Sequence, residues 1–285
     1  MTSLVTSIYF AYMLLTPALP SPAGRTGAPP PVAAAERRPI QDNSFLVEEA
    51  YNQDPGVIQH ISTFQRGRES RDWVYTFTQE WPVPRETHQL SYTVPVERIH
   101  ASSDGHAAPG DIALNYRYQL LGDGQARVAM APRFSLLLPV GNAAQSRGAG
   151  ATGYQVDVPV SLVVNERFVT HTNVGMTLTP HQENPSGERA STTAWNVGQS
   201  LVWLAHPNVN GLLEVVYTGG ETVVGAGRTA PARSCYVSPG VRWAMNLGRL
   251  QIVPGIAVPI GVGPSRGEQA LFFYLSFEHP LWEPK

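Results

Sequence analysis

The stretch Gly110-Asp-Ile-Ala-Leu-Asn-Tyr-Arg-Tyr-Gln-Leu120 (GDIALNYRYQL) alternates between two classes of side chain. One set of positions is apolar or aromatic: Ile112, Leu114, Tyr116, Tyr118 and Leu120. The other set is small or polar: Ala113, Asn115, Arg117 and Gln119. Because successive side chains of a β-strand point to opposite faces, this pattern predicts a strand with one apolar face. The fold then depends on which face meets water, since the apolar face is inside a soluble sheet but outside a membrane barrel.

The same alternation recurs from Val57 onward, where helical periodicity is almost absent. It predicts about twelve strands, at Val57–Arg66, Asp72–Val83, Thr87–Ile99, Asp111–Leu121, Gln125–Val140, Gly153–Val164, Phe168–Thr179, Thr192–Ala205, Gly211–Thr218, Ser234–Leu247, Leu250–Ile260 and Gln269–Glu278. Bacterial outer-membrane barrels have an even number of antiparallel strands. The pattern therefore favours an all-β fold, a closed antiparallel transmembrane β-barrel.

The connections between these strands alternate between long and short. The long ones, roughly ten residues or more where hairpin loops usually have 2–5, are His100–Gly110, Gly141–Thr152, Pro180–Ser191 and Gly219–Arg233, with Arg66–Arg71 and Gly261–Glu268 as shorter members. The short ones are Pro84–Glu86, Gly122–Gly124, Asn165–Arg167, His206–Asn210 and Gly248–Arg249. Long loops at one end and tight turns at the other are typical of outer-membrane barrels.

Tryptophan positions support an apolar face that meets lipid. Trp73 and Trp81 share a face of one strand, and Trp195 and Trp203 share a face of another with the same separation. At ~3.3 Å per residue and a tilt of ~40°, that separation spans about 20 Å along a barrel axis. Lipid-facing bands of similar height carry aromatic residues at both edges. We expect these four residues and Trp243 to form an aromatic girdle; ordinary core tryptophans are the alternative.

The opposite, polar faces carry charged residues on many strands: Glu80, Glu97, Arg117, Arg127, Arg133, Asp157, His171, Glu214 and Arg242. In a soluble protein they would form a solvated surface, and about twelve apolar faces would have to pack on one another. In a closed membrane barrel the apolar faces meet lipid, and the charges pair across the lumen. The candidate lumen-lining residues are the members of this set other than Glu80 and Arg127. They are expected either to pair structurally or to contact a solute.

Composition limits the function classes. The chain has 285 residues, a formal net charge of -2 and 15% charged residues, so it is not suited to bind a polyanion, and no nucleic-acid partner is expected. A single cysteine, Cys235, excludes a disulfide framework within the chain. The apolar run Leu4–Leu15 and the following Pro/Ala-rich tract predict a signal-like leader over residues 1–35. Residues 57–285 are expected to form the barrel.

Residues 36–56 form a separate N-terminal segment between the leader and the first strand. Ser44 suits a helix N-cap and Pro55-Gly56 a helix end, so one or two helical turns are expected between them. Phe45, Glu48, Glu49 and Tyr51 combine apolar bulk with negative charge. We expect these four residues to act as a periplasmic plug, with the glutamates meeting lumen arginines; a frayed leader is the alternative.

Three stretches together resemble one bacterial family. They are FLVEEAYNQDPGVIQH (residues 45–60), GDIALNYRYQL (residues 110–120) and LFFYLSFEHP (residues 271–280). They resemble the outer-membrane proteins grouped as the meta-pathway of phenol degradation family, and the resemblance covers roughly Phe45 to Trp282. It implies an outer-membrane β-barrel transporter and uptake of small aromatic or other hydrophobic compounds.

No motif points to catalysis. The chain has no Gly-rich phosphate loop, no Cys/His metal spacing and no GxSxG, so no catalytic residue, cofactor or metal is expected. His171 and Asn173 resemble part of the catalytic set of outer-membrane phospholipases, but no serine follows at the needed spacing. We expect His171 to lie in a lumen hydrogen-bond network.

The leading interpretation is an outer-membrane channel or transporter for small hydrophobic or aromatic compounds. One alternative is a barrel with a closed lumen that has a structural or surface-interaction role. The other is a soluble periplasmic lipid-binding β-protein. The expected partners are outer-membrane lipid, a small hydrophobic or aromatic solute and the barrel-assembly machinery.

Overall fold

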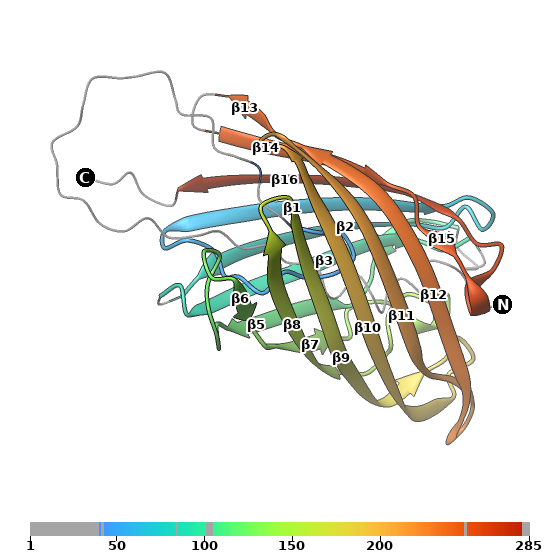
Figure 1. Ribbon diagram of the computed structural model, residues 1–285. Coiled ribbons are helices and arrows are strands. Elements are labelled where there is room, and N and C mark those ends of the chain that lie inside the picture. Colours follow the sequence, from blue (N-terminus) through green and yellow to red (C-terminus); the bar gives the residue numbers. More distant parts are fainter. Residues whose placement is uncertain (1–39, 41–42, 84, 101–104, 248–249, 281–285) are drawn as a thin grey trace, which may run out of the picture.

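The computed structural model describes residues 40, 43–83, 85–100, 105–247 and 250–280. The expected leader, residues 1–35, lies outside them. Antiparallel strands follow one another around a barrel (Figure 1). The strands are β1 (Val57–Gly67), β2 (Trp73–Pro82), β3 (His88–Arg98), β4 (Ala108–Pro109), β5 (Ile112–Tyr118), β6 (Val128–Met130), β7 (Arg133–Leu138), β8 (Gly153–Asn165), β9 (Phe168–Glu183), β10 (Arg189–His206), β11 (Val209–Gly225), β12 (Arg228–Trp243), β13 (Met245–Leu247), β14 (Leu250–Ala257), β15 (Ile260–Gly261) and β16 (Ala270–Pro280).

The barrel is closed by its first and last strands. β1 pairs with β16 along its whole length, from Val57 opposite Pro280 to Gly67 opposite Ala270. On the other side of the closure, β14 pairs with both β16 and β12. The short strands β4, β6, β13 and β15 are parts of interrupted strands, so the wall of the barrel consists of 12 strands. Closure leaves no sheet edge, which satisfies the backbone groups within lipid.

The faces of β5 answer the question that the sequence raised. Leu114 and Tyr116 are 45% and 40% exposed on the outside of the barrel, whereas Arg117 is 1% exposed and lies inside. The same alternation of exposed and buried residues is found along β8 and β10. A barrel wall with an apolar outer face and a charged inner face is suited to be surrounded by lipid. The prediction of a membrane-spanning β-barrel is confirmed, and this fold places the protein in an outer membrane.

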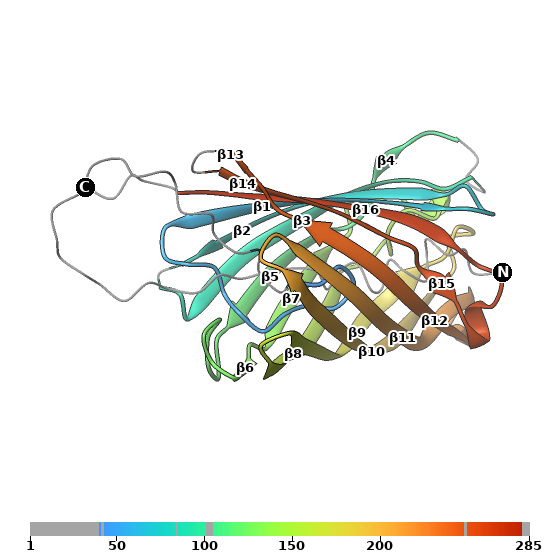
Figure 2. The ribbon, with the colours of Figure 1, turned by 45° about the horizontal axis from the view of Figure 1, so that its top comes forward.

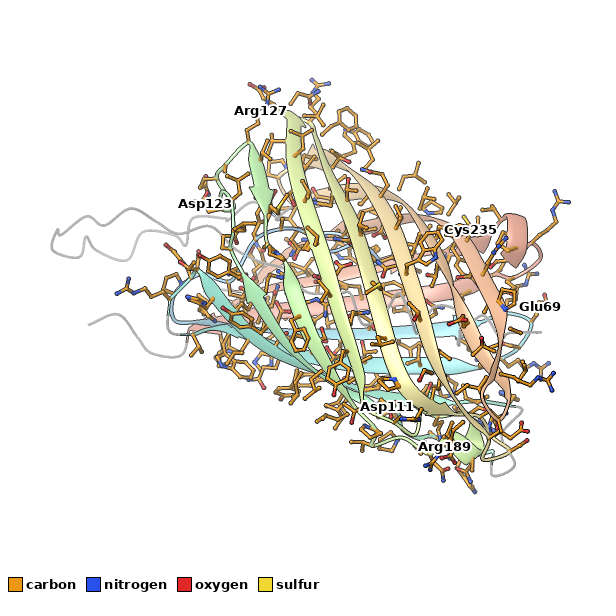
Figure 3. All side chains as sticks on the ribbon, turned by 90° about the horizontal axis from the view of Figure 1, so that it is seen from below. Glu69, Asp111, Asp123, Arg127, Arg189 and Cys235 are labelled. Carbon is orange, nitrogen blue, oxygen red and sulfur yellow. The ribbon has the colours of Figure 1, made fainter. Side chains whose placement is uncertain are left out.

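The two ends of the barrel differ in their connections. Residues 166–167 and 207–208 form tight turns at one end, where β1 begins and β16 ends. The opposite end carries the longer segment 139–152, with the 3-10 helix η1 (Ala143–Gln145), and the segment 262–269, with η2 (Gly263–Ser265). Figure 3 shows Asp123 and Arg127 at the short-turn end, and Asp111 and Arg189 at the long-loop end. In outer-membrane barrels short turns are periplasmic and long loops extracellular.

Two of the expected long loops are largely strand. β11 and β12 remain paired from Gly220 opposite Ala232 as far as Gly225 opposite Arg228, inside the expected loop Gly219–Arg233. β9 and β10 likewise pair within Pro180–Ser191, with Arg189 opposite Glu183. Backbone pairing does not depend on side-chain polarity, so a hairpin can extend beyond the lipid belt where its sequence becomes polar.

Proline interrupts two strands that the alternation predicted as continuous. The expected strand Gln125–Val140 is divided into β6 and β7 around Pro132, which has no N–H to donate to a ladder. The expected strand Leu250–Ile260 is divided into β14 and β15 near Pro259. Among the described residues, no helix is long and apolar enough to cross a membrane.

The expected helical turns between Ser44 and Tyr51 are absent. These residues form bends and irregular backbone inside the barrel. Figure 2 shows this segment, in blue, entering the ring of strands before it turns back to β1. The reason is that its backbone N–H groups find partners on the barrel wall, as described below, and a helix would direct them to its own carbonyl groups.

Candidate functional site

The barrel lumen is occupied by residues Asn43–Asp54, called the inner segment here. Phe45, Val47, Glu48 and Gln53 have no solvent-exposed surface. An unpaired backbone donor in such a place is costly, because water cannot reach it. The wall supplies hydrogen-bond partners for many of these backbone groups, and those partners define the site.

Glu214 on β11 binds the start of the inner segment through one oxygen atom. Its Oε1 accepts hydrogen bonds from the backbone N–H groups of Phe45 at 3.1 Å, Leu46 at 2.7 Å and Val47 at 3.0 Å. Three consecutive N–H groups that point to one side form a concave site for a negatively charged oxygen, and the Glu214 carboxylate occupies it.

Side-chain amides of the wall pair with the inner segment as a neighbouring strand would. Asn173 Oδ1 accepts from the N–H of Glu48 at 2.6 Å, and Asn173 Nδ2 donates to the carbonyl of the same residue at 3.1 Å. Gln119 accepts from the N–H of Asn52 at 3.0 Å and donates to the carbonyl of Ala50 at 2.7 Å. An amide can do this because it carries a donor and an acceptor side by side.

Glu48 connects the inner segment to two arginines of the wall. Its carboxylate lies 2.9 Å from Nη2 of Arg117 and 2.9 Å from Nε of Arg133, and all three side chains are at most 1% exposed. Arg117 also donates to the carbonyl of Tyr51 at 2.8 Å. Asp157 is the cross-strand neighbour of Arg133 and accepts from Asn196 at 3.3 Å. Buried charges of this kind are retained only where they are paired.

Arg242 on β12 holds the first residue of the inner segment. Its guanidinium donates to the carbonyl of Asn43 at 2.6 Å and to Oδ1 of the same residue at 3.0 Å. Asn43 in turn donates to Glu49 at 3.1 Å. Both glutamates of the expected plug therefore lie in the lumen, where Glu48 contacts Arg117 and Arg133 and Glu49 accepts from Asn43.

Phe45 fits where the wall has glycines. Its ring centroid lies 5.4 Å from that of Phe272 and 5.2 Å from that of Tyr274 on β16. A Cβ atom at Gly240 or Gly255 would come within 2.8 Å or 2.5 Å of the Phe45 ring. The missing side chains make the space for this ring. Glycines in the middle of strands mark such close approaches, and this signal was overlooked in the sequence.

His171 lies in a hydrogen-bond network, and its partner is a serine that the sequence did not indicate. Ser161 on β8 is directly opposite His171 on β9, and its Oγ is 2.8 Å from Nδ1. The N–H of Ala50 donates to the same Oγ at 2.8 Å, and the Tyr51 ring meets the imidazole edge-on. The sequence did not indicate this serine because Ser161 precedes His171 and meets it only across the hairpin of β8 and β9. In the part of the chain that the structure describes, no three His, Cys, Asp or Glu side chains could hold a metal ion.

A second polar cluster lies at the long-loop end. Asp111 accepts from the N–H groups of Gly141 at 3.0 Å and Ala149 at 2.7 Å, which holds the segment 139–152 in place. Burial raises the pKa of the Asp111 carboxyl above its usual value, and these two hydrogen bonds oppose the shift. Arg147 from the same segment is 2% exposed and donates to the carbonyl of His106 at 3.0 Å.

All seven candidate lumen residues point into the barrel, but they do not form one group. Glu97 belongs to the long-loop end, where its carboxyl interacts with Arg147 and Asp111. Glu80 is also buried, whereas Arg127 comes just before β6 near the short-turn end and is exposed. The seven are Glu97, Arg117, Arg133, Asp157, His171, Glu214 and Arg242.

The lumen is lined by both apolar and polar side chains. Buried apolar residues gather on β1, β11, β12, β14 and β16 around Phe45: Ile61, Val216, Tyr236, Val253, Phe272 and Tyr274. Hydroxyl and amide side chains line the other strands and bond to one another, for example Thr78 with Thr93 at 2.9 Å and Gln155 with Thr177 at 3.0 Å. A molecule inside this lumen would meet both kinds of surface.

The five tryptophans expected to form a girdle lie on the outside of the wall. Trp195, Trp203 and Trp243 are 47%, 52% and 38% exposed. Trp73 and Trp81 face outward from opposite ends of β2 and are half-buried among other aromatic rings. Trp195 and Trp73 lie toward the long-loop end, and the other three toward the short-turn end.

No protein-family model matches the chain, and no curated protein matches its sequence. The fold, however, is similar to solved outer-membrane structures. A COG4313 outer membrane channel from Pseudomonas putida F1 has a TM-score of 0.62 and 12% identity over 81% of this chain and 98% of that chain. The NanC porin has a TM-score of 0.53 and 10% identity over 77% of this chain and 98% of that chain. At such identities the likeness concerns the fold alone.

Proposed function

We propose that this protein is an outer-membrane channel or transporter for small hydrophobic or aromatic compounds, with the inner segment as a plug that closes the lumen. The observation that carries the proposal is that the inner segment is held in the lumen chiefly by side chains of the wall. It is a separate piece of chain rather than part of the wall, so it can leave while the barrel remains closed around its full ladder of strands.

The contacts of the plug suit reversible displacement. Each neutral hydrogen bond between plug and wall contributes only about 0.5–1.5 kcal/mol net, because water replaces the partner when the bond breaks. The charges of Glu48, Arg117 and Arg133 are costly to separate in a dry lumen but can be hydrated once water enters. Closure is therefore expected to be stable and opening to be cooperative.

The lumen surface supports a solute with an aromatic ring and a polar group. The Phe45 ring packs between Phe272 and Tyr274, and Gly240 and Gly255 open space behind it. A flat ring of a solute could take the same place once Phe45 has moved. The resemblance to the phenol meta-pathway family and the description of the P. putida structure as an outer membrane channel support the same reading.

A disulfide lock tests the plug directly. A Cβ at position 198 would lie 3.8 Å from the Cβ of Val47, within the usual range for bridged cysteines. We therefore suggest Val47→Cys with Gly198→Cys in a Cys235→Ser background, reconstituted in liposomes. The oxidised form should pass phenol-sized solutes far more slowly than the reduced form in a swelling assay.

The two single-cysteine variants are the controls, and they should respond little to reductant. Equal permeation by the oxidised and reduced double variant would contradict the plug. Absence of permeation in every form, including one lacking residues 43–54, would favour the alternative of a closed-lumen barrel with a structural or surface-interaction role.

A further inference from the structure

Two arginines and a tryptophan form a row on the outside of the barrel. Arg66 on β1 is directly opposite Trp73 on β2, and Trp73 is directly opposite Arg98 on β3. Neighbouring strands are about 4.8 Å apart, so the two arginine backbones are separated by roughly 10 Å across the indole. Both arginines are exposed, and Trp73 is half-buried.

The described acidic residues of the neighbouring strands do not neutralise the positive charge of this row. The two acidic residues of β1, β2 and β3 are Glu80 and Glu97, and both face the lumen. Within the described part of the chain, neither Arg66 nor Arg98 has a hydrogen bond or ion pair. The row therefore offers two free guanidinium groups to the surroundings. The exposed residues of the hairpin between β1 and β2 are Arg68, Glu69 and Arg71, which together add one positive charge nearby.

The row lies at one edge of the lipid-facing band. It is at the long-loop end, in the last pairs before the β1–β2 hairpin whose Glu69 is labelled in Figure 3. Toward the membrane centre the wall is aromatic, with Phe64 5.7 Å from Trp73 and 6.4 Å from Phe273 between ring centroids. Tryptophan at such an edge lies at headgroup level. Because the long-loop end is extracellular, the guanidinium groups face the headgroups of the outer leaflet.

We infer that this row, Arg66–Trp73–Arg98, binds the phosphate groups of a phosphorylated glycolipid in the outer leaflet. A guanidinium group can bind one phosphate through two parallel N–H···O bonds. Two of them on either side of an indole suit a headgroup with phosphates at its two ends. The acyl chains would lie along Phe64 and Phe273. A second copy of this chain is the competing occupant.

The test is native mass spectrometry of the full chain in detergent, titrated with diphosphoryl lipid A. Arg66→Gln with Arg98→Gln should weaken retention of this lipid by roughly tenfold, since two charge-assisted contacts are removed. Arg127→Gln with Arg167→Gln is the matched control, because both residues are exposed near the short-turn end. Heat-modified gel mobility identifies any variant that fails to fold. Arg66→Lys with Arg98→Lys keeps the charge but loses the paired N–H donors of the guanidinium groups, so it should retain only part of the binding.

Five comparisons decide the outcome. Retention should fall for lipid A without phosphates and for phosphatidylethanolamine, and inorganic pyrophosphate alone should not bind to a comparable degree. Equal retention of the dephosphorylated lipid, or an equal loss in the control variant, would overturn the inference. Binding of pyrophosphate as tight as that of the lipid would point to a free-phosphate site instead. A variant that changes the oligomeric state but not lipid retention would assign the row to a contact between copies.

Discussion

Nη2 of Arg117 lies 2.9 Å from the carboxylate of Glu48, and both side chains are hidden from solvent. Arg117 belongs to the wall and Glu48 to the plug that we propose. Their contact is therefore where the fold of the barrel and the closure of its lumen are coupled.

Replacing Glu48 with Gln should loosen the plug. Removing one member of a buried ion pair typically costs about 3–5 kcal/mol, because the remaining charges are left without compensation. Arg117 and Arg133 would then repel each other inside the lumen. Planar-bilayer recordings should show more frequent opening, with Glu69→Gln, an exposed hairpin residue, as the control. An unchanged current would argue against the ion cluster as a lock.

Inserting a methyl group behind Phe45 should displace its ring. In Gly255→Ala the new Cβ would lie 2.5 Å from the ring, whereas in Gly211→Ala it would lie 3.4 Å from Trp203, an ordinary contact. Overpacking usually costs about 1–3 kcal/mol. Gly255→Ala should increase permeation in the liposome assay, and Phe45→Leu in the same chain should partly restore closure. Equal permeation by the two glycine variants would show that the Phe45 ring tolerates the added methyl group.

Glu214 should matter as an acceptor more than as a charge. Glu214→Gln keeps a carbonyl oxygen for the three N–H groups, whereas Glu214→Ala leaves them buried without it, at about 1–3 kcal/mol each. Hydrogen exchange of the Phe45–Val47 amides should therefore accelerate far more in the Ala variant. Thr177→Ala, which alters a lumen contact to Gln155, should leave those amides protected. Equal acceleration by Gln and Ala would assign the effect to charge.

The aromatic girdle predicts where two tryptophans lie in the bilayer. Trp195 stacks on Tyr217 with ring centroids 5.2 Å apart, near the long-loop end, and Trp203 lies near the opposite turn. Lipids brominated near the headgroup should quench both more strongly than lipids brominated near the chain end. The contribution of each is obtained from the difference between the unaltered protein and Trp195→Phe or Trp203→Phe. Stronger quenching from the chain end would place them at the membrane centre.

Much of the wall could be predicted from local sequence. The alternation in residues 110–120 assigns Tyr116 to one face and Arg117 to the other, because the side-chain period of a strand is two. The number of such strands then favours a barrel in which every apolar face meets lipid over a soluble fold in which these faces pack on one another. The ends of the strands followed less directly from the alternation. Strand pairing continues through polar residues in β11 and β12, and it stops at Pro132.

The contents of the lumen could not be predicted in the same way. Ser161 was not linked to His171, because they meet only through the register of β8 and β9. Likewise, Glu214 and the N–H of Leu46 are far apart in sequence. The local sequence by itself determined the strands and the direction of their faces, since both follow from the geometry of a single extended chain. Only the tertiary structure decided which inward side chains meet and what the inner segment contacts, because barrel closure alone brings distant strands around one enclosed space.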